Sequence, residues 1–433
     1  MKLHRDLGFY VPAFFMMKVD VDMAVEKILG TVDERVFSHE LIHFLQDVST
    51  TYGLINISKC VDVIKSQNRA LRKKSLPVQL PLLSSDLSDT VMANNDLFSL
   101  YVGDDAEKFK EFPESYSVVD VIEDEMEVEL VPYPVKFINI KYGSSVISTT
   151  EEFHFGAMAI YESMANLIES EIYGEEERRK NFPYDAALML AEHLCPTISH
   201  NRLAVCELCE ASLMYYNPAE IFVDCLKKIH ELGLVFKNKN EYYRYVVSNY
   251  TLEAEPVSVE YINASELAES QLNDLFTVSP LKEEKWASGM VIRARKLRNS
   301  DMSISARLWG IDKDRSRQSL MDFIRSIGMP IVFNRNFEAW LRDSEESLRT
   351  PLMYPAILSF HEIVQSKQQG CILYGHCVNE NSGCTPDDNC HSAPWARLAQ
   401  GKSCYFSNIW KMWGLENVQI SAKEDIQDIL NTF

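Results

Sequence analysis

Residues 33–50 read DERVFSHELIHFLQDVST, a stretch in which apolar side chains recur at the spacing of an α-helix. Asp33 stands where it can cap the first turn. Within the stretch, His39 and His43 form an H-E-x-x-H pattern, with Glu40 directly after the first histidine. Residues four apart share one helix face, so the two imidazoles can bind one metal ion while Glu40 reaches a water molecule on it. The pattern predicts a helix that carries two metal ligands and a general base.

The residues that flank the motif are uncharged, which favours a metal site shielded from water. They are Val36, Phe37, Leu41, Ile42, Phe44 and Leu45. The alternative is a helix in which both histidines pack on apolar neighbours and Glu40 is solvated. Three titratable groups would then need partners among bulky apolar side chains, which is unfavourable. We therefore expect a metal site.

A catalytic zinc ion takes a third protein ligand and leaves a fourth position open. Residues 156–173 return to a helical period, and Glu162 lies among apolar residues in the middle of this segment. A lone carboxylate there is costly without a partner, so Glu162 is the expected third ligand. A surface glutamate on an amphipathic helix is the alternative reading of this residue. Other candidates for the third ligand lie nearby, at Glu151, Glu152, His154, Glu169 and Glu171.

The stretch HELIHFLQD at 39–47, followed by a helix with Glu162-x-x-x-Asn166, resembles the gluzincin (thermolysin-like) branch of the zincin metallopeptidases. The resemblance implies a zincin-like catalytic core and residues that orient the metal ligands, here Asp47 and Asn166. The family has Asp at the position of Asn166. An amide oxygen can still accept a hydrogen bond from an imidazole, without the charge that raises ligand basicity.

The same resemblance implies the cofactor and the reaction. Zn²⁺ held by His39, His43 and Glu162 lowers the pKa of a water molecule, and Glu40 takes its proton while the hydroxide attacks a peptide carbonyl. Glu40 then passes the proton to the leaving amine. The expected function is that of a metalloendopeptidase acting on an intracellular protein or peptide. An oxyanion-stabilising Tyr or His is also implied, with the candidates His193, His200, Tyr215 and Tyr216, as is a sheet edge for the substrate, expected at 134–141.

The hydrophobic pattern predicts an α+β fold that is predominantly helical, with a small sheet, two metal-bearing helices and a large helical domain. Residues 8–19 and 130–148 are expected to be strands, the latter with a turn at 143–145. Three regions are expected: a catalytic domain at 1–175 with an acidic insertion at 76–130, a helical domain at 176–366 and a Cys/His-rich segment at 367–433. Helices are predicted at 33–50, 55–74, 156–173, 184–194, 202–216, 218–232, 260–274, 314–327 and 336–348.

The chain has 433 residues, of which 46% are apolar and 24% are charged, as in soluble globular proteins. Its net charge of −20 repels phosphate backbones and anionic lipids, so we expect neither general nucleic-acid binding nor membrane binding. Pro12 interrupts the first apolar stretch and Lys18 and Asp20 follow it, which argues against a signal peptide. Ten cysteines without such a peptide fit a reducing compartment, and we expect a cytoplasmic protein.

The segment from Gly370 to Cys404 departs from the helical pattern and holds half of the cysteines. A structural metal could bind Cys371, Cys377, Cys384 and Cys390, although the spacing matches no standard zinc finger. Free thiols and a disulfide are the alternatives. Aromatic residues from Trp395 to Trp413 can instead anchor the segment on the helical domain, which is the reading we favour. Cys206 and Cys209 form a C-x-x-C on a predicted helix and are expected to be buried thiols.

Basic residues concentrate at 282–325 in this acidic chain. They could bind an anionic ligand or a regulatory partner, or form a solvated helix face. For the whole protein, the alternative to an enzyme is a sensor or interaction protein that keeps a degenerate zincin scaffold. Asn166 in place of the family's Asp is the feature that favours this alternative.

Overall fold

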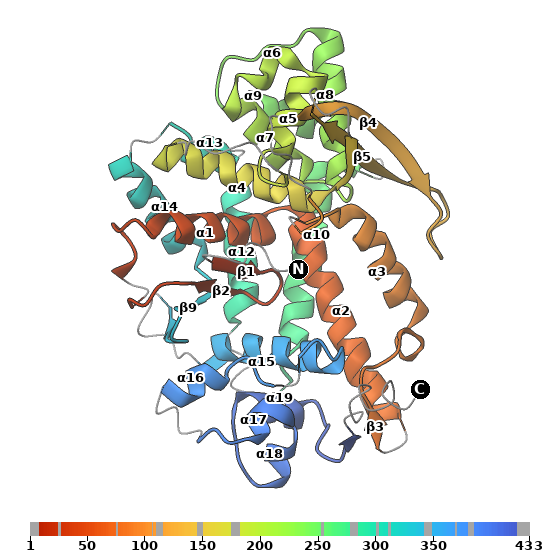
Figure 1. Cartoon of the computed structure of the whole chain (residues 1–433), viewed down its shortest axis with the longest axis vertical. Helices are drawn as coiled ribbons and strands as arrows, with labels where there is room; N and C mark the ends of the chain where they lie inside the picture. Colours follow the sequence, from red (N-terminus) through yellow and green to blue (C-terminus); the bar gives the residue numbers. More distant parts are fainter. Residues whose placement is uncertain are drawn as a thin grey trace.

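Helices α1 (Glu34–Ser49) and α4 (Ala157–Tyr173) cross the middle of the molecule and pack on each other (Figure 1). Both helices were predicted, and the structure is predominantly helical with small sheets, as expected from the hydrophobic pattern. The computed structural model describes residues 8–24, 27–74, 77–105, 107–109, 116–144, 150–174, 182–252, 255–277, 285–299, 303–310, 313–341, 349–368, 370–379 and 385–421.

A sharp bend connects α1 to α2 (Thr51–Lys73), which begins four residues earlier than predicted. Thr50 is extended, and its Oγ1 accepts a hydrogen bond from the backbone N of Gly53 at 3.1 Å. A Cβ at position 53 would lie 2.3 Å from the carbonyl oxygen of Asp47, so only glycine permits this approach. The bend sends α2 away from the metal motif along the right of Figure 1.

The N-terminal strand prediction, 8–19, corresponds to a hairpin rather than one strand. Strand β1 (Gly8–Val11) pairs antiparallel with β2 (Met16–Val19). The chain reverses between them, where Ala13 and Phe15 have positive φ angles of 64° and 51°. β2 also pairs in parallel with β9 (Ile331–Phe333), which pairs with β10 (Ala339–Trp340), so the strand order is β1-β2-β9-β10.

The helix predicted at 336–348 is wrong where the structure describes it. Ala339 and Trp340 form β10 because they pair with Phe333 and Val332 of β9, and this pairing overrides the local helical pattern. Residues 342–348 lie outside the described part of the chain.

A second sheet contains β4 (Ser117–Met126), β5 (Val135–Gly143) and β6 (Thr150–Phe155), in that order. The prediction that 134–141 is a sheet edge is wrong, because β5 is paired on both sides. The acidic segment 76–130 supplies the covering strand β4, together with β3 (Val78–Gln79), a 3₁₀ turn (Ser84–Asp86) and α3 (Asp89–Val102).

Helices lie near the predicted segments 184–194, 202–216, 218–232, 260–274 and 314–327, whereas the helices at 196–199, 241–249, 286–298 and 304–308 were not predicted. Helices α5 to α9 lie together at the top of Figure 1. A short two-stranded sheet, β7 (Thr251–Leu252) with β8 (Glu255–Pro256), precedes α10. The helices are α5 (Ala186–Leu194), α6 (Pro196–Ser199), α7 (Arg202–Ser212), α8 (Pro218–Leu232), α9 (Glu241–Asn249), α10 (Val257–Asp274), α12 (Trp286–Arg298), α13 (Ile304–Leu308) and α14 (Lys313–Ile327).

The C-terminal segment packs on α15 (Arg349–Val364) at the bottom of Figure 1. Trp410 and Trp413 contact Phe360 of α15, with ring centroids 6.1 and 5.0 Å away. The Trp413 indole also donates a hydrogen bond to the Leu275 carbonyl at 3.0 Å. The segment contains α16 (Tyr374–Asn379), α17 (Asn389–Ser392), α18 (Ala396–Ala399), α19 (Tyr405–Met412) and β11 (Ile420–Ser421), which pairs with β3.

One hydrophobic core runs from Tyr10 to Leu415 and contains residues of all three predicted regions. Two strand pairs, β9 with β2 and β11 with β3, each join strands from different predicted regions. Among the helices that the structure describes, none is long and apolar enough to cross a membrane.

Candidate metal centre

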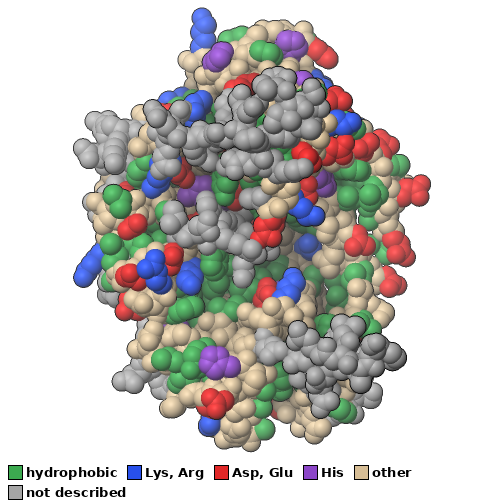
Figure 2. Space-filling view, viewed as in Figure 1, with side chains coloured by type: hydrophobic (Ala, Val, Ile, Leu, Met, Phe, Trp, Pro, Cys, Tyr) green, Lys and Arg blue, Asp and Glu red, His purple; other side chains and the backbone are tan. Residues whose placement is uncertain are grey.

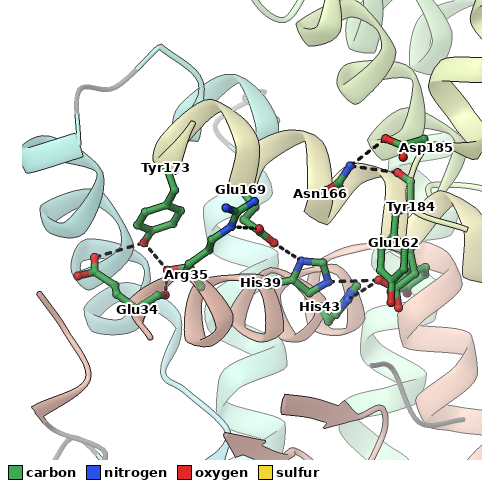
Figure 3. Close-up of polar contacts among 12 residues, drawn as sticks. Glu34, Arg35, His39, His43, Glu162, Asn166, Glu169, Tyr173, Tyr184 and Asp185 are labelled. Atoms are coloured by element: carbon green, nitrogen blue, oxygen red, sulfur yellow. Dashed lines mark hydrogen bonds and ion pairs between the residues drawn. The ribbon is translucent and has the colours of Figure 1, made fainter. Parts of the chain in front are cut away.

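His39 and His43 of α1 and Glu162 of α4 converge where the two helices cross (Figure 3). The Oε2 of Glu162 lies 3.2 Å from the Nε2 of His39 and 3.5 Å from the Nε2 of His43. In the described part of the chain, these residues form the one group of three or more potential ligands whose donor atoms all lie within 4.8 Å of one another. The three residues predicted as ligands are therefore brought together in one place.

The donor atoms have the spacing of a metal coordination shell. Two ligands about 2.1 Å from a tetrahedral ion are about 3.4 Å apart, close to both distances from Glu162. The Nε2 of His43 and the Oε2 of Glu40 are buried and have no hydrogen-bond partner. Because a buried polar atom without a partner is costly, both atoms fit a site that holds an ion and a water molecule. The group could hold a metal ion.

The other ring nitrogen of each histidine is held by a second side chain. The Nδ1 of His39 lies 2.7 Å from Glu169, whose carboxylate also pairs with Arg35. The Nδ1 of His43 lies 2.8 Å from the Oε1 of Gln46, and the Gln46 amide donates to the Tyr161 carbonyl at 3.0 Å. Both contacts place the Nδ1 proton on the outer side and leave Nε2 for a metal, as in other histidine metal sites.

The two orienting residues implied by the family resemblance are not the ones that orient the histidines. Asn166 donates to the Tyr184 carbonyl and to the Oδ1 of Asp185, both at 3.3 Å. Glu169, one turn further along α4, reaches His39 instead, because residues four and seven positions after Glu162 lie on the same helix face. Sequence reasoning named Glu169 only as an alternative ligand and did not identify Gln46.

Asp47 also has a different role from the one expected. Its Oδ2 accepts hydrogen bonds from the Tyr10 hydroxyl at 2.8 Å and from the backbone N of Ala13 at 2.9 Å. Burial raises the pKa of Asp47 to about 7, although both hydrogen bonds act to lower it. Asp47 therefore attaches the β1–β2 hairpin to α1.

The electrostatics of the centre favour positive charge between its carboxylates. Burial alone raises the pKa of Glu162, but the attraction of His43 and His39 outweighs burial and lowers that pKa below its ordinary value. Burial alone lowers the pKa of His39, but Glu162 and Glu169 raise it well above its ordinary value. Burial raises the pKa of Glu40 well above its ordinary value, so this carboxyl can hold a proton.

The sheet edge beside the centre is β1, which pairs only with β2 among the described strands. Glu40 accepts a hydrogen bond from the backbone N of Tyr10 in this strand. At Gly8, a Cβ would lie 2.9 Å from a methyl carbon of Val36, so β1 packs closely on α1. The strand nearest the predicted general base is thus β1, and not the segment 134–141.

None of the predicted oxyanion-stabilising residues contacts the three ligands in the described structure. The Tyr215 hydroxyl donates to the carbonyls of Val246 and Tyr250, the Tyr216 hydroxyl donates to Glu260, and His193 and His200 are exposed. The aromatic rings next to the centre are Tyr161, 6.3 Å from the His43 ring, and Tyr184, 6.5 Å from the His39 ring. The sequence gives one clue to these two tyrosines: Tyr161 directly precedes Glu162. It gives none for Tyr184.

The remaining candidate ligands lie elsewhere in the fold. Glu151, Glu152 and His154 are in strand β6, and Glu171 accepts a hydrogen bond from the backbone N of Gly310 at 3.0 Å. Cys206 and Cys209 are fully buried on α7, as expected for core thiols. In the basic segment, Arg298 pairs with Glu210 and Arg295 pairs with Glu269, so these two cations are used within the fold.

The C-terminal cysteines gather without forming a metal site in the described structure. Cys371, Cys377 and Cys390 line one small cavity together with Cys404. Their sulfur atoms do not form a group of three within ligating distance among the described residues. Cys384, the fourth predicted ligand, lies outside the described part of the chain.

Comparison with known proteins finds no relative of this chain. The chain matches no protein-family model, no curated protein and no solved structure.

Proposed function

We propose that this protein is a zinc-dependent peptidase whose metal is held by His39, His43 and Glu162. The observation that carries the proposal is the buried convergence of these three side chains beside Glu40, whose Oε2 has no partner. Two imidazoles and one glutamate are the ligands of catalytic zinc in many metallopeptidases. A zinc ion held there would supply a Lewis acid that lowers the pKa of water and polarises a peptide carbonyl.

Glu40 is the general base of the proposed reaction. Its carboxylate takes the proton of the attacking water at Oε2 and delivers it to the leaving amine. The Tyr10 backbone N holds the carboxylate in position through a hydrogen bond. Glu169 and Gln46 orient the two histidines from behind. An extended peptide beside β1 would lie close to Glu40.

The proposal also includes the class of substrate. We expect a protein or peptide in the cytoplasm, because ten unevenly spaced cysteines fit a reducing compartment. The net charge of −20 disfavours nucleic acid as a partner.

A sensor or interaction protein with a degenerate zincin scaffold is the second candidate. The feature in its favour was the absence of a carboxylate at Asn166. Glu169 now supplies a carboxylate on the Nδ1 of His39, so the orienting charge is present. The enzyme is therefore the better supported of the two functions.

The test combines metal analysis with one conservative variant. Purified wild-type protein should contain about one equivalent of zinc, and His43→Ala should lose it in a background with Cys371, Cys377, Cys384 and Cys390 changed to serine. Glu40→Gln should keep the metal and lower kcat on a peptide library about 10²–10⁴-fold. Iron in place of zinc would contradict the metal assignment, since the same ligand set binds iron(II).

The substrate is identified by comparing protein termini in cells that express wild type and Glu40→Gln. New termini that depend on Glu40 support the peptidase. Zinc binding with no Glu40-dependent cleavage, in cells or on the library, would contradict it and favour the sensor.

A further inference from the structure

One cavity has a volume of about 910 Å³ and is separate from the metal centre. Its walls come from the β1–β2 hairpin, α2, α3 and α15, and none of the three metal ligands lines it. Figure 2 shows a hollow on this face, between the hairpin and α2, where green apolar surface adjoins blue basic side chains. Its volume is within the range of small-molecule sites, about 300–1,000 Å³.

Four lysines line this cavity: Lys18, Lys59, Lys108 and Lys367. In the part of the chain that the structure describes, none of these four ammonium groups forms an ion pair with a carboxylate. Acidic residues outnumber basic ones by 63 to 43, so partners are abundant. Among the described residues, the lysines that form ion pairs are Lys65, Lys74, Lys136, Lys141, Lys227, Lys228 and Lys402.

Two of the four lysines are partly buried and contact aromatic rings instead of acids. The Nζ of Lys18 lies 4.4 Å from the centre of the Phe337 ring, and the Nζ of Lys59 lies 4.5 Å from that of Phe98. Such contacts stabilise a cation without neutralising it. Burial lowers the pKa of Lys59, which shows that its charge lacks compensation.

His361 on α15 also lines the cavity, and its pKa is lowered by burial and by the positive charge of nearby lysines. Burial, together with the charges of Lys367 and Lys59, lowers this pKa to about 3. Three acidic residues also line the cavity, namely Asp104, Asp105 and Glu362. Asp104 and Asp105 accept hydrogen bonds from the backbone N of His154 and of Glu107, and the four lysines outnumber the three carboxylates.

Apolar side chains in the wall include Phe9, Phe14, Val63, Met158 and Leu358. Polar uncharged side chains line the cavity as well, namely Asn56, Asn95, Ser99, Gln365 and Gln368. We propose that this cavity binds a small amphipathic anion, with a carboxylate or phosphate head beside Lys59 and an apolar body against the hairpin and α15. Charge complementarity selects the head, and burial of apolar surface holds the body. This site is distinct from the proposed peptidase centre and does not depend on it.

The test measures binding of three probes with the same twelve-carbon chain by calorimetry, below their micellar concentrations. Dodecanoate and dodecyl phosphate carry the two anionic heads, and dodecyltrimethylammonium carries a cationic one. We expect an anionic probe to bind one to one and at least about tenfold more tightly than the cationic probe. The stronger of the two anions identifies the head group. Equal affinity for cationic and anionic heads would overturn the proposal.

Lys59→Met removes the central charge while keeping the length of the side chain. It should weaken anion binding about tenfold or more, and Lys65→Met on the same helix is the matched control that should not. If Lys59→Met does not fold, Lys18→Met should give the same loss. Equal binding by the folded cavity variant and the control would also contradict the site. Zinc content should stay unchanged in all variants, which separates this outcome from failure of the metal centre.

Discussion

The Nδ1 of His39 lies 2.7 Å from the Oε2 of Glu169, two turns beyond Glu162 on α4. Helix α4 therefore supplies both a candidate metal ligand, Glu162, and the carboxylate that orients a second candidate ligand, His39. Arg35, one turn before His39 on α1, pairs with the same carboxylate. Glu169 of α4 thus contacts two residues of α1, Arg35 and His39, where the helices cross.

We expect Glu169→Gln to weaken zinc binding about 10–100-fold, because the amide cannot supply the charge that raises the basicity of His39. Competition with a zinc-chelating dye measures the change. Asn166→Ala is the matched control on the same helix and should bind zinc nearly as wild type does. A larger loss in Asn166→Ala than in Glu169→Gln would restore the role implied by the family resemblance.

Glu210 should be the most important buried carboxylate for stability outside the metal centre. It pairs with Arg298 and accepts hydrogen bonds from the backbone N of Ile304 at 2.7 Å and of Ser305 at 2.8 Å. Glu210→Gln leaves the guanidinium buried without a counter-charge and should lower the free energy of unfolding by about 3–5 kcal/mol. Urea denaturation measures this change.

The control for Glu210 is Glu269, which pairs with Arg295 at 3.0 Å nearer the surface. Glu269→Gln should cost only about 0–1 kcal/mol, because water reaches this half-buried pair and screens it. Equal losses in the two variants would show that burial does not determine the strength of these pairs.

His361 should make the protein less stable in acid. Its pKa is about 3 in the folded chain and 6.5 ordinarily, so between these values the unfolded chain binds a proton that the folded chain does not. Stability therefore falls as pH falls through this window, by up to about 1.4 kcal/mol per pH unit. Urea titrations from pH 7 to pH 4 should show a shallower fall for His361→Asn than for wild type. Parallel curves would show that His361 titrates normally in the fold.

The C-terminal segment should depend on aromatic packing and not on a metal. Trp410 is 2% exposed and contacts Phe360, so Trp410→Ala should expose the segment to proteases through a loss of about 3–5 kcal/mol. Limited proteolysis in a His39→Ala background, with and without a strong chelator, measures this. Cleavage of the wild-type segment that appears only after chelation would point to a metal on the cysteines instead.

The helical part of the fold and the metal-binding motif could be predicted because both follow from local periodicity. His39 and His43 share a face wherever residues 33–50 are helical. Glu162 was identified because a charge in the middle of an apolar helix needs a partner. These inferences use only neighbours along one helix, and the bounds of α1 and α4 agree with them.

Tertiary structure decided the rest. Glu169 rather than Asn166 faces His39 because the crossing of α1 and α4 sets which turn lies opposite the imidazole. Strand β10 formed within a predicted helix because it pairs with β9, which is itself paired with β2 near the other end of the chain. Strand β5 became a central strand because β4 and β6 pair with it on both sides. Side-chain chemistry and helical spacing are local, so the residues that could bind a metal can be predicted from the sequence alone. Which groups orient those ligands, and which strand lies beside them, depends on contacts between distant segments that no local pattern encodes.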